Sequence, residues 1–192
     1  MEKSVLLLLD LQPDLLASLP NQESYLEKVI GTLTKTSTSR NRSAIQTIHV
    51  TTSFRPNYPE LHPNNPSADR IKASDKFIHG TSSAEIHASI PVTADDIHVT
   101  KKRVSAFSGS DLDMLLKSMK IENLVIAGII TSGAVLSTVR AAADLDYKVT
   151  VLADLCMDRD QEVHDILVGK VFPKQATVIG SEEWMYGFGT EN

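Results

Sequence analysis

The sequence predicts a doubly wound α/β fold, in which a parallel sheet of about six strands carries helices on both faces. Short, continuous apolar runs recur along the chain, as expected of parallel strands that are buried on both sides. These runs alternate with segments of helical periodicity, which is the pattern of βαβ units. The length of 192 residues suits one such domain better than two. We therefore expect residues 1–192 to form a single domain.

The N-terminal half begins with a strand expected at Ser4–Asp10 and a helix at about Gln22–Ser39. A second strand is expected at Ala44–Thr51. Between Phe54 and Asp75 the chain is polar and carries four prolines, which predicts a long surface loop. A loop of this length inside a compact domain is usually functional, so it is a candidate lid over a pocket. One face of the first helix is apolar through Leu26, Val29, Ile30 and Leu33.

The C-terminal half repeats the alternation, and its clearest unit is a buried strand, a turn and a helix in direct succession. Before this unit, a helix capped by Ser110 and Asp111 carries Leu112, Leu115, Leu116 and Met119. The helix of the clearest unit has Val135, Thr138, Val139 and Ala142 at helical spacing. The tail after Ser181 has a weak signal. The expected elements are a strand at Ile97–Lys101, a strand at Asn123–Ala127, a turn at Gly128–Gly133, a helix at Ala134–Leu145, a strand at Lys148–Ala153, a helix near Gln161–Val171 and a strand at Ala176–Ile179.

Composition excludes several classes of protein. The formal charge of -5 and the pI near 5.6 provide no basic face, and the densest basic run is Lys101–Arg103, so we expect no nucleic-acid partner. No apolar stretch approaches the roughly 20 residues that span a bilayer, so we expect no membrane insertion. The single cysteine, Cys156, cannot form an internal disulfide and suits a reducing compartment, which predicts a cytoplasmic protein.

Candidate site residues stand where predicted strands end. In open α/β sheets, ligands bind beyond the carboxyl ends of the strands at the point where the strand order reverses. Asp10 ends the first strand, Lys101 ends the Ile97 strand, and Thr131–Ala134 form the turn after the Asn123 strand. Each signal alone has a structural alternative, because an Asp after a strand is often a turn residue and a basic triplet is often a solvated face.

Four segments resemble the successive signature blocks of the isochorismatase-like, or cysteine hydrolase, family. Together they span nearly the whole chain, and their order and separation are more specific than any one of them. They are LLLLDLQPDL at 6–15, VTKKRVSAFSGSDLDMLL at 99–116, LVIAGIITSGAVLSTVRAAADLDYKVTVLAD at 124–154 and DRDQEVH at 158–164.

This resemblance implies that an Asp and a Lys converge on the residue that begins the helix of the third block. The matching residues are Asp10, Lys101 and Ala134. In the amidase members a cysteine stands at the third position and attacks the amide carbonyl after the Asp takes its proton. Ala134 has only a methyl group, so no thiolate can form there. Ser137 and Thr138 lie about one helical turn further on, and Ser132 is expected to cap the helix.

The electrostatic part of such a site does not depend on the cysteine. Backbone N–H groups at a helix N-terminus can bind an anion or a developing oxyanion whatever the side chain. The resemblance implies a non-proline cis peptide at Ile129–Ile130. The residues predicted for the oxyanion and substrate site are Gln12, Ile130, Thr131, Ser132 and Gly133, with Phe54, Arg55 and Arg70 from the proline-rich loop.

Substrate and cofactor expectations follow from departures within the family. True isochorismatases have glycine at the cysteine position, and their Asp protonates a vinyl ether. They resemble K-W-R-Y-S-A-F where this chain has Lys101–Phe107, and they carry an aromatic residue where it has Ile130, which argues against isochorismate itself. The metal-binding Asp-x-His of the nicotinamidases has no match among the scattered histidines, and His49 is expected to be a core residue, so no metal is predicted. With no phosphate loop, no cofactor is predicted.

Three hypotheses follow from the substitution at Ala134. The first is a hydrolase that acts on a small, anionic molecule without a covalent cysteine intermediate. The second is a binding protein that kept the pocket and lost the reaction. The third is an amide hydrolase in which Ala134 replaced the nucleophile. The resemblance also implies a homo-oligomer, either a dimer or a tetramer.

Overall fold

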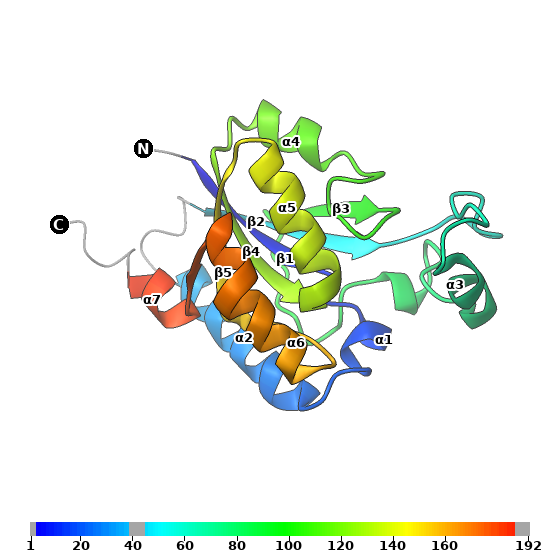
Figure 1. Cartoon of the computed structure of the whole chain (residues 1–192), viewed down its shortest axis with the longest axis horizontal. Helices are drawn as coiled ribbons and strands as arrows, with labels where there is room; N and C mark the ends of the chain where they lie inside the picture. Colours follow the sequence, from blue (N-terminus) through cyan, green and yellow to red (C-terminus); the bar gives the residue numbers. More distant parts are fainter. Residues whose placement is uncertain (1–2, 39–44, 187–192) are drawn as a thin grey trace.

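A single parallel sheet of six strands forms the centre of the protein (Figure 1). The computed structural model describes residues 3–38 and 45–186. The strand order is β3-β2-β1-β4-β5-β6, so the order reverses between β1 and β4. This confirms the predicted doubly wound fold, and the ends of β1 and β4 flank the switch point. The strands are β1 Ser4–Leu9, β2 Ile45–Thr52, β3 Ile97–Lys101, β4 Asn123–Ile129, β5 Lys148–Met157 and β6 Thr177–Ile179.

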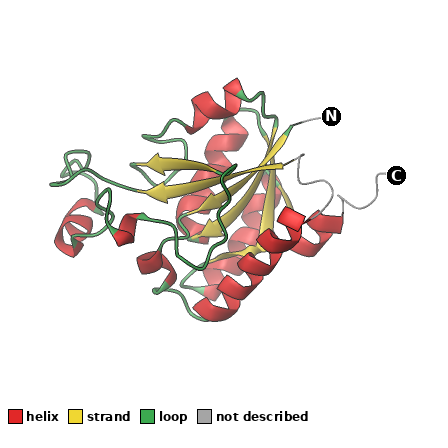
Figure 2. Ribbon diagram, turned by 180° about the vertical axis from the view of Figure 1, so that it is seen from behind, coloured by secondary structure: helices red, strands yellow, loops and turns green. Residues whose placement is uncertain are grey.

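Helices cover both faces of the sheet, as predicted (Figure 2). One core cluster joins the sheet to α4, α5 and α6, and the other joins it to α1, α2 and α7. The predicted apolar faces of α2 and α5 lie in these clusters. The helices are α1 Pro13–Leu16, α2 Gln22–Thr38, α3 Ala68–Ser74, α4 Leu112–Ser118, α5 Leu136–Asp144, α6 Gln161–Ile166 and α7 Ser181–Tyr186. No helix in the described parts of the chain is both long enough and apolar enough to cross a membrane.

Several predicted boundaries were wrong. The predicted strand at Lys148–Ala153 continues to Met157, because β5 pairs again with β4 after an irregularity in register. Ser181–Tyr186, at the start of the tail with the weak signal, form α7, which that signal did not predict. The predicted helix start at Ala134 lies inside a π-helical turn, Thr131–Val135, that leads into α5. Another π-helical turn at Leu167–Val171 and a 3₁₀ turn at Phe172–Lys174 follow α6. Two predicted boundary residues, Ser39 and Ala44, lie outside the described residues.

The proline-rich stretch, predicted as a long surface loop, contains a helix and buried residues of its own. Residues 54–78, which we call the projecting segment, contain α3 and a small hydrophobic cluster of their own. Phe54, Tyr58, Leu61 and Ala68 are buried in that cluster. The segment extends from the end of β2, and α3 stands apart from the sheet in Figure 1. The prolines interrupt secondary structure without preventing local burial of apolar side chains.

β1 and β4 approach each other closely at Gly128. Its φ is +124°, and a Cβ at this position would lie 2.3 Å from the backbone oxygen of Leu9. Gly128 pairs with Leu9 in the parallel register, so the contact lies directly before Asp10. Only glycine permits both this backbone conformation and this separation.

Candidate active site

Asp10 and Lys101 form a buried ion pair at the carboxyl end of the sheet. Lys101 Nζ lies 2.9 Å from Asp10 Oδ2. Asp10 is 5% exposed and Lys101 is 2% exposed. Asp10 follows β1 with a φ of +52°, a left-handed conformation that Asp adopts more readily than most residues. The two residues predicted from separate strand ends are thus brought together.

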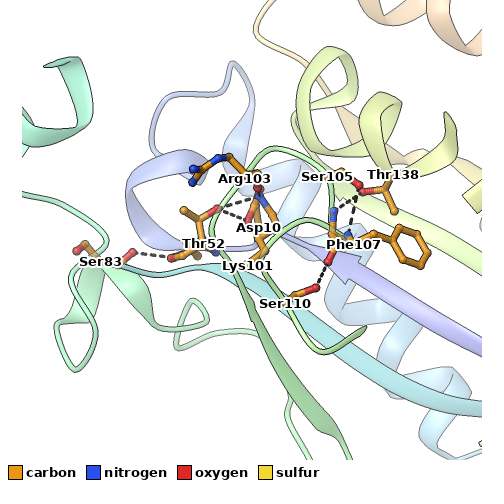
Figure 3. Close-up of polar contacts among 11 residues, drawn as sticks. Asp10, Thr52, Ser83, Lys101, Arg103, Ser105, Phe107, Ser110 and Thr138 are labelled. Atoms are coloured by element: carbon orange, nitrogen blue, oxygen red, sulfur yellow. Dashed lines mark hydrogen bonds and ion pairs between the residues drawn. The ribbon is translucent and has the colours of Figure 1, made fainter. Parts of the chain in front are cut away.

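Thr52, the last residue of β2, lies between them and completes a ring of polar contacts (Figure 3). Its hydroxyl donates to Asp10 Oδ1 at 3.1 Å and accepts from Lys101 Nζ at 2.9 Å. Lys101 Nζ also donates to the backbone oxygen of Arg103 at 3.0 Å. We call Asp10, Thr52 and Lys101 the carboxylate ring. The parallel register, which pairs Thr52 with Lys101, brings the two side chains to the same place.

Gln12 supports the ring through the backbone of β2. Its Nε2 donates to the backbone oxygens of Thr52 and Ser83, each at 2.9 Å, and its Oε1 accepts from the Thr52 amide at 2.8 Å. The side chain is fully buried, and both of its N–H donors are engaged. Gln12 therefore holds the end of β2 in place. This supporting contact is distinct from the contact with substrate that the sequence predicted for Gln12.

The turn after β4 carries Ala134, which is 4% exposed and lies in the same core cluster as Leu9. The Ile129–Ile130 peptide bond is cis, as expected from the resemblance. The side chain of Ile130 packs against the cluster on the other face of the sheet. The Gly133 amide donates to the Ile130 oxygen at 2.9 Å, so this amide is already engaged.

Asp158 caps the turn, in place of the predicted Ser132 side chain. The Ser132 amide donates to Asp158 Oδ2 at 2.6 Å, and the Arg159 amide donates to Oδ1 at 2.8 Å. Burial raises the pKa of Asp158, but hydrogen bonds from Ser132, Asp160 and Arg159 outweigh it and hold the pKa below its ordinary value of 3.8. A carboxylate thus already stands at the positive end of the helix.

We expect Asp158→Asn to lower the free energy of unfolding by about 2 kcal/mol near neutral pH, because hydrogen bonds to a charged group are lost. The folded-state pKa of Asp158 is depressed, so its carboxylate stabilises the fold above pH 3.8, and this contribution is lost as the pH falls through the folded value. Urea denaturation across acid and neutral pH should show a deficit that shrinks in acid. Asp165→Asn, which changes an exposed carboxylate on α6, is the matched control. A pH-independent deficit would contradict this account.

Thr131 contacts the helix that follows β5. Its hydroxyl oxygen lies 2.9 Å from His164 Nδ1, and Thr131 is fully buried. His164 belongs to α6, which packs beside the turn. The turn is therefore held by α6 and Asp158, and these contacts involve no residue of the carboxylate ring.

The projecting segment is attached next to the ring by basic residues. The Phe54 ring is buried in the segment's own cluster, 5.8 Å from the Tyr58 ring, whereas Arg55 is exposed and paired with Glu60 at 2.7 Å. Arg103 donates to the Glu60 backbone oxygen at 2.8 Å. Lys102 donates to the backbone oxygen of Ser53. Arg70 lies exposed on α3.

The pKa of Lys102 is lowered from its ordinary value, chiefly by burial. The negative charge of Glu60 opposes this lowering, and the positive charge of Arg55 adds to it. The basic groups Arg55, Lys102 and Arg103 gather where the projecting segment meets the loop after β3, with Glu60 as the acidic group among them. This concentration of positive charge contrasts with the chain's formal charge of -5.

Two side chains considered as substitutes for the missing nucleophile are engaged or buried. The Thr138 hydroxyl accepts from the Ala106 amide at 3.0 Å, which ties α5 to the loop after β3 (Figure 3). Burial raises the pKa of the Cys156 thiol to about 12, as expected of a buried structural cysteine. These two side chains are therefore poor substitutes for a nucleophile at Ala134.

Two features lie away from the ring. His49 is buried and its Nε2 contacts Asp96 at 3.2 Å, but its Nδ1 has no partner, so the predicted core histidine is only partly satisfied. An open depression of about 450 Å³ lies along the outer edge of β3, and it shares no residue with the ring. Its lining residues are His98, Thr100, Gly109, Ser110 and Asp111. Among residues 3–38 and 45–186, no group of three His, Cys, Asp or Glu residues is arranged to hold a metal ion.

Sequence reasoning missed three polar residues of this region. Thr52 lies one residue beyond the predicted end of its strand, so its place at a strand end was the available signal. Asp158 and His164 lie in the DRDQEVH segment, which resembled the family without giving either residue a role.

Comparison with known proteins identifies the family. Residues 4–183 match the isochorismatase domain family. The uncharacterized isochorismatase family protein YecD of Escherichia coli is 30% identical over 125 residues, which cover 61% of this chain and 66% of that protein. For YwoC of Bacillus subtilis, another uncharacterized isochorismatase family protein, the identity is 33% over 102 residues, which cover 53% of this chain and 54% of that protein. The chain thus spans between about half and two thirds of these curated relatives.

More distant similarities extend over more of the chain. The ureidoacrylate amidohydrolase RutB of Agrobacterium fabrum is 27% identical over 175 residues, which cover 85% of this chain and 73% of that protein. The crystal structure of an isochorismatase-like hydrolase from Alkaliphilus metalliredigens superposes with a TM-score of 0.83 at 21% identity, covering 97% of this chain and 99% of that one. The structural likeness concerns the fold, and the family match covers most of the sequence. The chain belongs to the isochorismatase family, whose named relatives include hydrolases.

Proposed function

We propose that the protein is a hydrolase of a small, anionic amide or ester, and that it activates water directly in place of a cysteine. The observation that carries the proposal is the carboxylate ring. One oxygen of Asp10 accepts a hydrogen bond from Thr52, and the other lies in an ion pair with the Lys101 ammonium at 2.9 Å. This arrangement suits a carboxylate that begins the reaction as a proton acceptor.

In the proposed reaction, Asp10 takes a proton from a water molecule while the water oxygen attacks the carbonyl carbon of the substrate. The carbonyl π bond breaks and its electron pair moves to the oxygen, which becomes an oxyanion. The pair then re-forms the carbonyl as the bond to the amine or alkoxide breaks, and the proton on Asp10 passes to that leaving group. Lys101 contributes positive charge beside Asp10. Each proton or electron pair that leaves one group is received by another, so the net charge does not change at any step.

We assign the oxyanion contact to the amides of Thr131 and Ala134. The other two amides of the Thr131–Ala134 turn are engaged, that of Ser132 by Asp158 and that of Gly133 by Ile130. Anionic substrates are favoured by the basic groups of Arg55, Lys102 and Arg103 beside the ring. The proposed partner is therefore a small-molecule substrate, and the proposed reaction uses side chains and backbone amides of this chain.

The test is a panel of small carboxylate-bearing amides, esters and vinyl ethers, assayed with the wild-type protein and with Ala134→Cys. We expect the wild type to hydrolyse an amide or ester. Turnover of vinyl ethers alone would instead favour Asp10 as a proton donor. Binding without turnover on all three classes would make the chain a binding protein and overturn the proposal.

We expect Ala134→Cys to raise amide hydrolysis by about 100-fold, because a thiol at the position where the amidase members carry their cysteine adds a nucleophilic route. Alkylation by iodoacetamide should abolish the gain. Cys156 is buried with a raised pKa and should not react, which keeps the background low. Ser137→Cys, about one helical turn further along α5, is the matched control. A gain confined to Ala134→Cys, with an inactive wild type, would favour an amidase whose nucleophile was replaced.

A further inference from the structure

The hydroxyl of Thr52 links the two charged groups of the ring. A hydroxyl has one hydrogen to donate and lone pairs to accept. Here the hydrogen goes to Asp10 Oδ1 at 3.1 Å, and a lone pair receives Lys101 Nζ at 2.9 Å. Each bond therefore runs in a fixed direction while Asp10 is ionised.

The hydrogen bonds of Lys101 are complete in this arrangement. An ammonium group has three N–H donors. Lys101 Nζ donates to Thr52 Oγ1 at 2.9 Å and to the backbone oxygen of Arg103 at 3.0 Å, and it forms an ion pair with Asp10 Oδ2 at 2.9 Å. Lys101 consequently has no further donor for a bound molecule unless one of these bonds breaks. Its effect on a substrate acts through its charge and through the orientation that it gives to Asp10.

The backbone of Thr52 is also held firmly. Its amide donates to Gln12 Oε1 at 2.8 Å, and its carbonyl oxygen accepts from Gln12 Nε2 at 2.9 Å. A β-branched side chain has few χ1 rotamers, so a fixed backbone fixes the hydroxyl as well. Through Gln12, the position of the hydroxyl is linked to the 3₁₀ turn Ser82–Ala84.

We propose that Thr52 is a positioning residue for the proposed hydrolysis: its hydroxyl orients the Asp10 carboxylate and completes the coordination of Lys101, leaving the remaining lone pairs of Asp10 to receive the proton of water. This inference rests on the proposed function. A purely space-filling Thr52 would be replaceable by valine, which has nearly the same shape. A positioning hydroxyl would not.

The test compares Thr52→Val, Thr52→Ser and Thr51→Val. The first removes the hydroxyl and leaves Lys101 and Asp10 each without one partner, whereas the second keeps a hydroxyl. Thr51 precedes Thr52 in β2, and its hydroxyl contacts His98 Nε2 at 2.8 Å on the opposite face of the sheet. Thr51→Val is therefore a matched control that leaves the ring intact.

With the substrate that the panel identifies, we expect Thr52→Val to lower kcat by about 10- to 100-fold with little change in KM, because the base is misoriented while binding groups are unaffected. Thr52→Ser should recover most of that loss, and Thr51→Val should behave as the wild type. Wild-type kcat in Thr52→Val would overturn the proposal. If Asp10→Asn keeps its turnover, the proposed function fails instead, so the two failures are distinguishable.

A second measurement does not depend on turnover. A hydrogen-bonded, buried lysine ammonium gives a proton–nitrogen NMR correlation that Lys101→Met would assign. We expect this signal to be present in the wild type, Thr52→Ser and Thr51→Val, and to shift or broaden in Thr52→Val. An unchanged Lys101 signal in Thr52→Val would show that the hydroxyl does not hold the ammonium, and it would overturn the proposal whether or not a substrate is known.

Discussion

Replacement of Asp10 by asparagine is expected to reduce turnover by at least about 100-fold, because general acid–base catalysis typically contributes that much or more. The amide oxygen of asparagine can still accept a hydrogen bond from Lys101, but the side chain cannot take a proton from water. The measurement is kcat on the substrate found by the panel. Asp14→Asn is the control, since Asp14 lies in α1 and pairs with Lys76 at 2.6 Å, outside the ring. Undiminished turnover in Asp10→Asn would exclude Asp10 as the catalytic group.

The same substitution leaves a buried ammonium without its counter-charge, which costs about 3–5 kcal/mol when a buried pair is broken. Circular dichroism must therefore accompany the kinetics. If Asp10→Asn does not fold, the double variant Asp10→Asn with Lys101→Met removes both charges and keeps the test possible. A folded, active double variant would contradict the assignment of Asp10.

Gly128→Ala is expected to lower the free energy of unfolding by more than about 4 kcal/mol, which places it among the exceptional point mutations. The new Cβ would lie 2.3 Å from the Leu9 oxygen and 2.5 Å from the Leu9 nitrogen, and the φ of +124° disfavours any side chain. Because these contacts are with backbone atoms, relief requires β1 and β4 to separate. Urea denaturation followed by circular dichroism measures the loss.

Gly31→Ala provides the control for Gly128→Ala. Gly31 lies in α2, and a Cβ there would meet nothing within 4 Å. Alanine is the better helix former, so this change should stabilise the protein by about 0.5–1 kcal/mol. Equal effects of the two substitutions would show that the close approach at Gly128 is unimportant for stability.

The fold could be predicted because its strands are buried on both faces. Runs such as Val5–Leu9 are apolar throughout, and this pattern distinguishes parallel strands from surface strands without tertiary information. The end of β5 was missed for the opposite reason. Its pairing with β4 breaks after Ile126 and resumes at Gly128, opposite Cys156, and such an irregularity depends on the neighbouring strand.

The site could be predicted in part. Asp10 and Lys101 end buried strands, so the rule for ligand sites in open sheets is sufficient to predict that they lie together. Thr52 and Asp158 were missed because their roles depend on register and on a contact between separate segments. A threonine at a strand end is common in any sequence, and only the pairing of Thr52 with Lys101 gives it partners.

The projecting segment was misjudged because composition alone cannot distinguish a solvated loop from a small folded unit. Its prolines and asparagines are typical of loops, yet Phe54, Tyr58 and Leu61 provide enough apolar surface for a local core. The aromatic residues were the available signal. Phe54, which was predicted to belong to the substrate site, is buried inside the segment.

Having its own core, the projecting segment is an energetic unit that can be distinguished from the sheet. Its cluster is separate from both main clusters, and it is joined to the rest of the chain by few polar contacts, such as Lys76 with Asp14 and Arg103 with the Glu60 oxygen. The free energy of opening it is set by a few apolar side chains and these contacts, which is a fraction of the free energy of global unfolding. Opening of the segment and unfolding of the sheet can therefore occur independently, so changes within residues 54–78 can alter the local stability of the segment without altering how the domain folds.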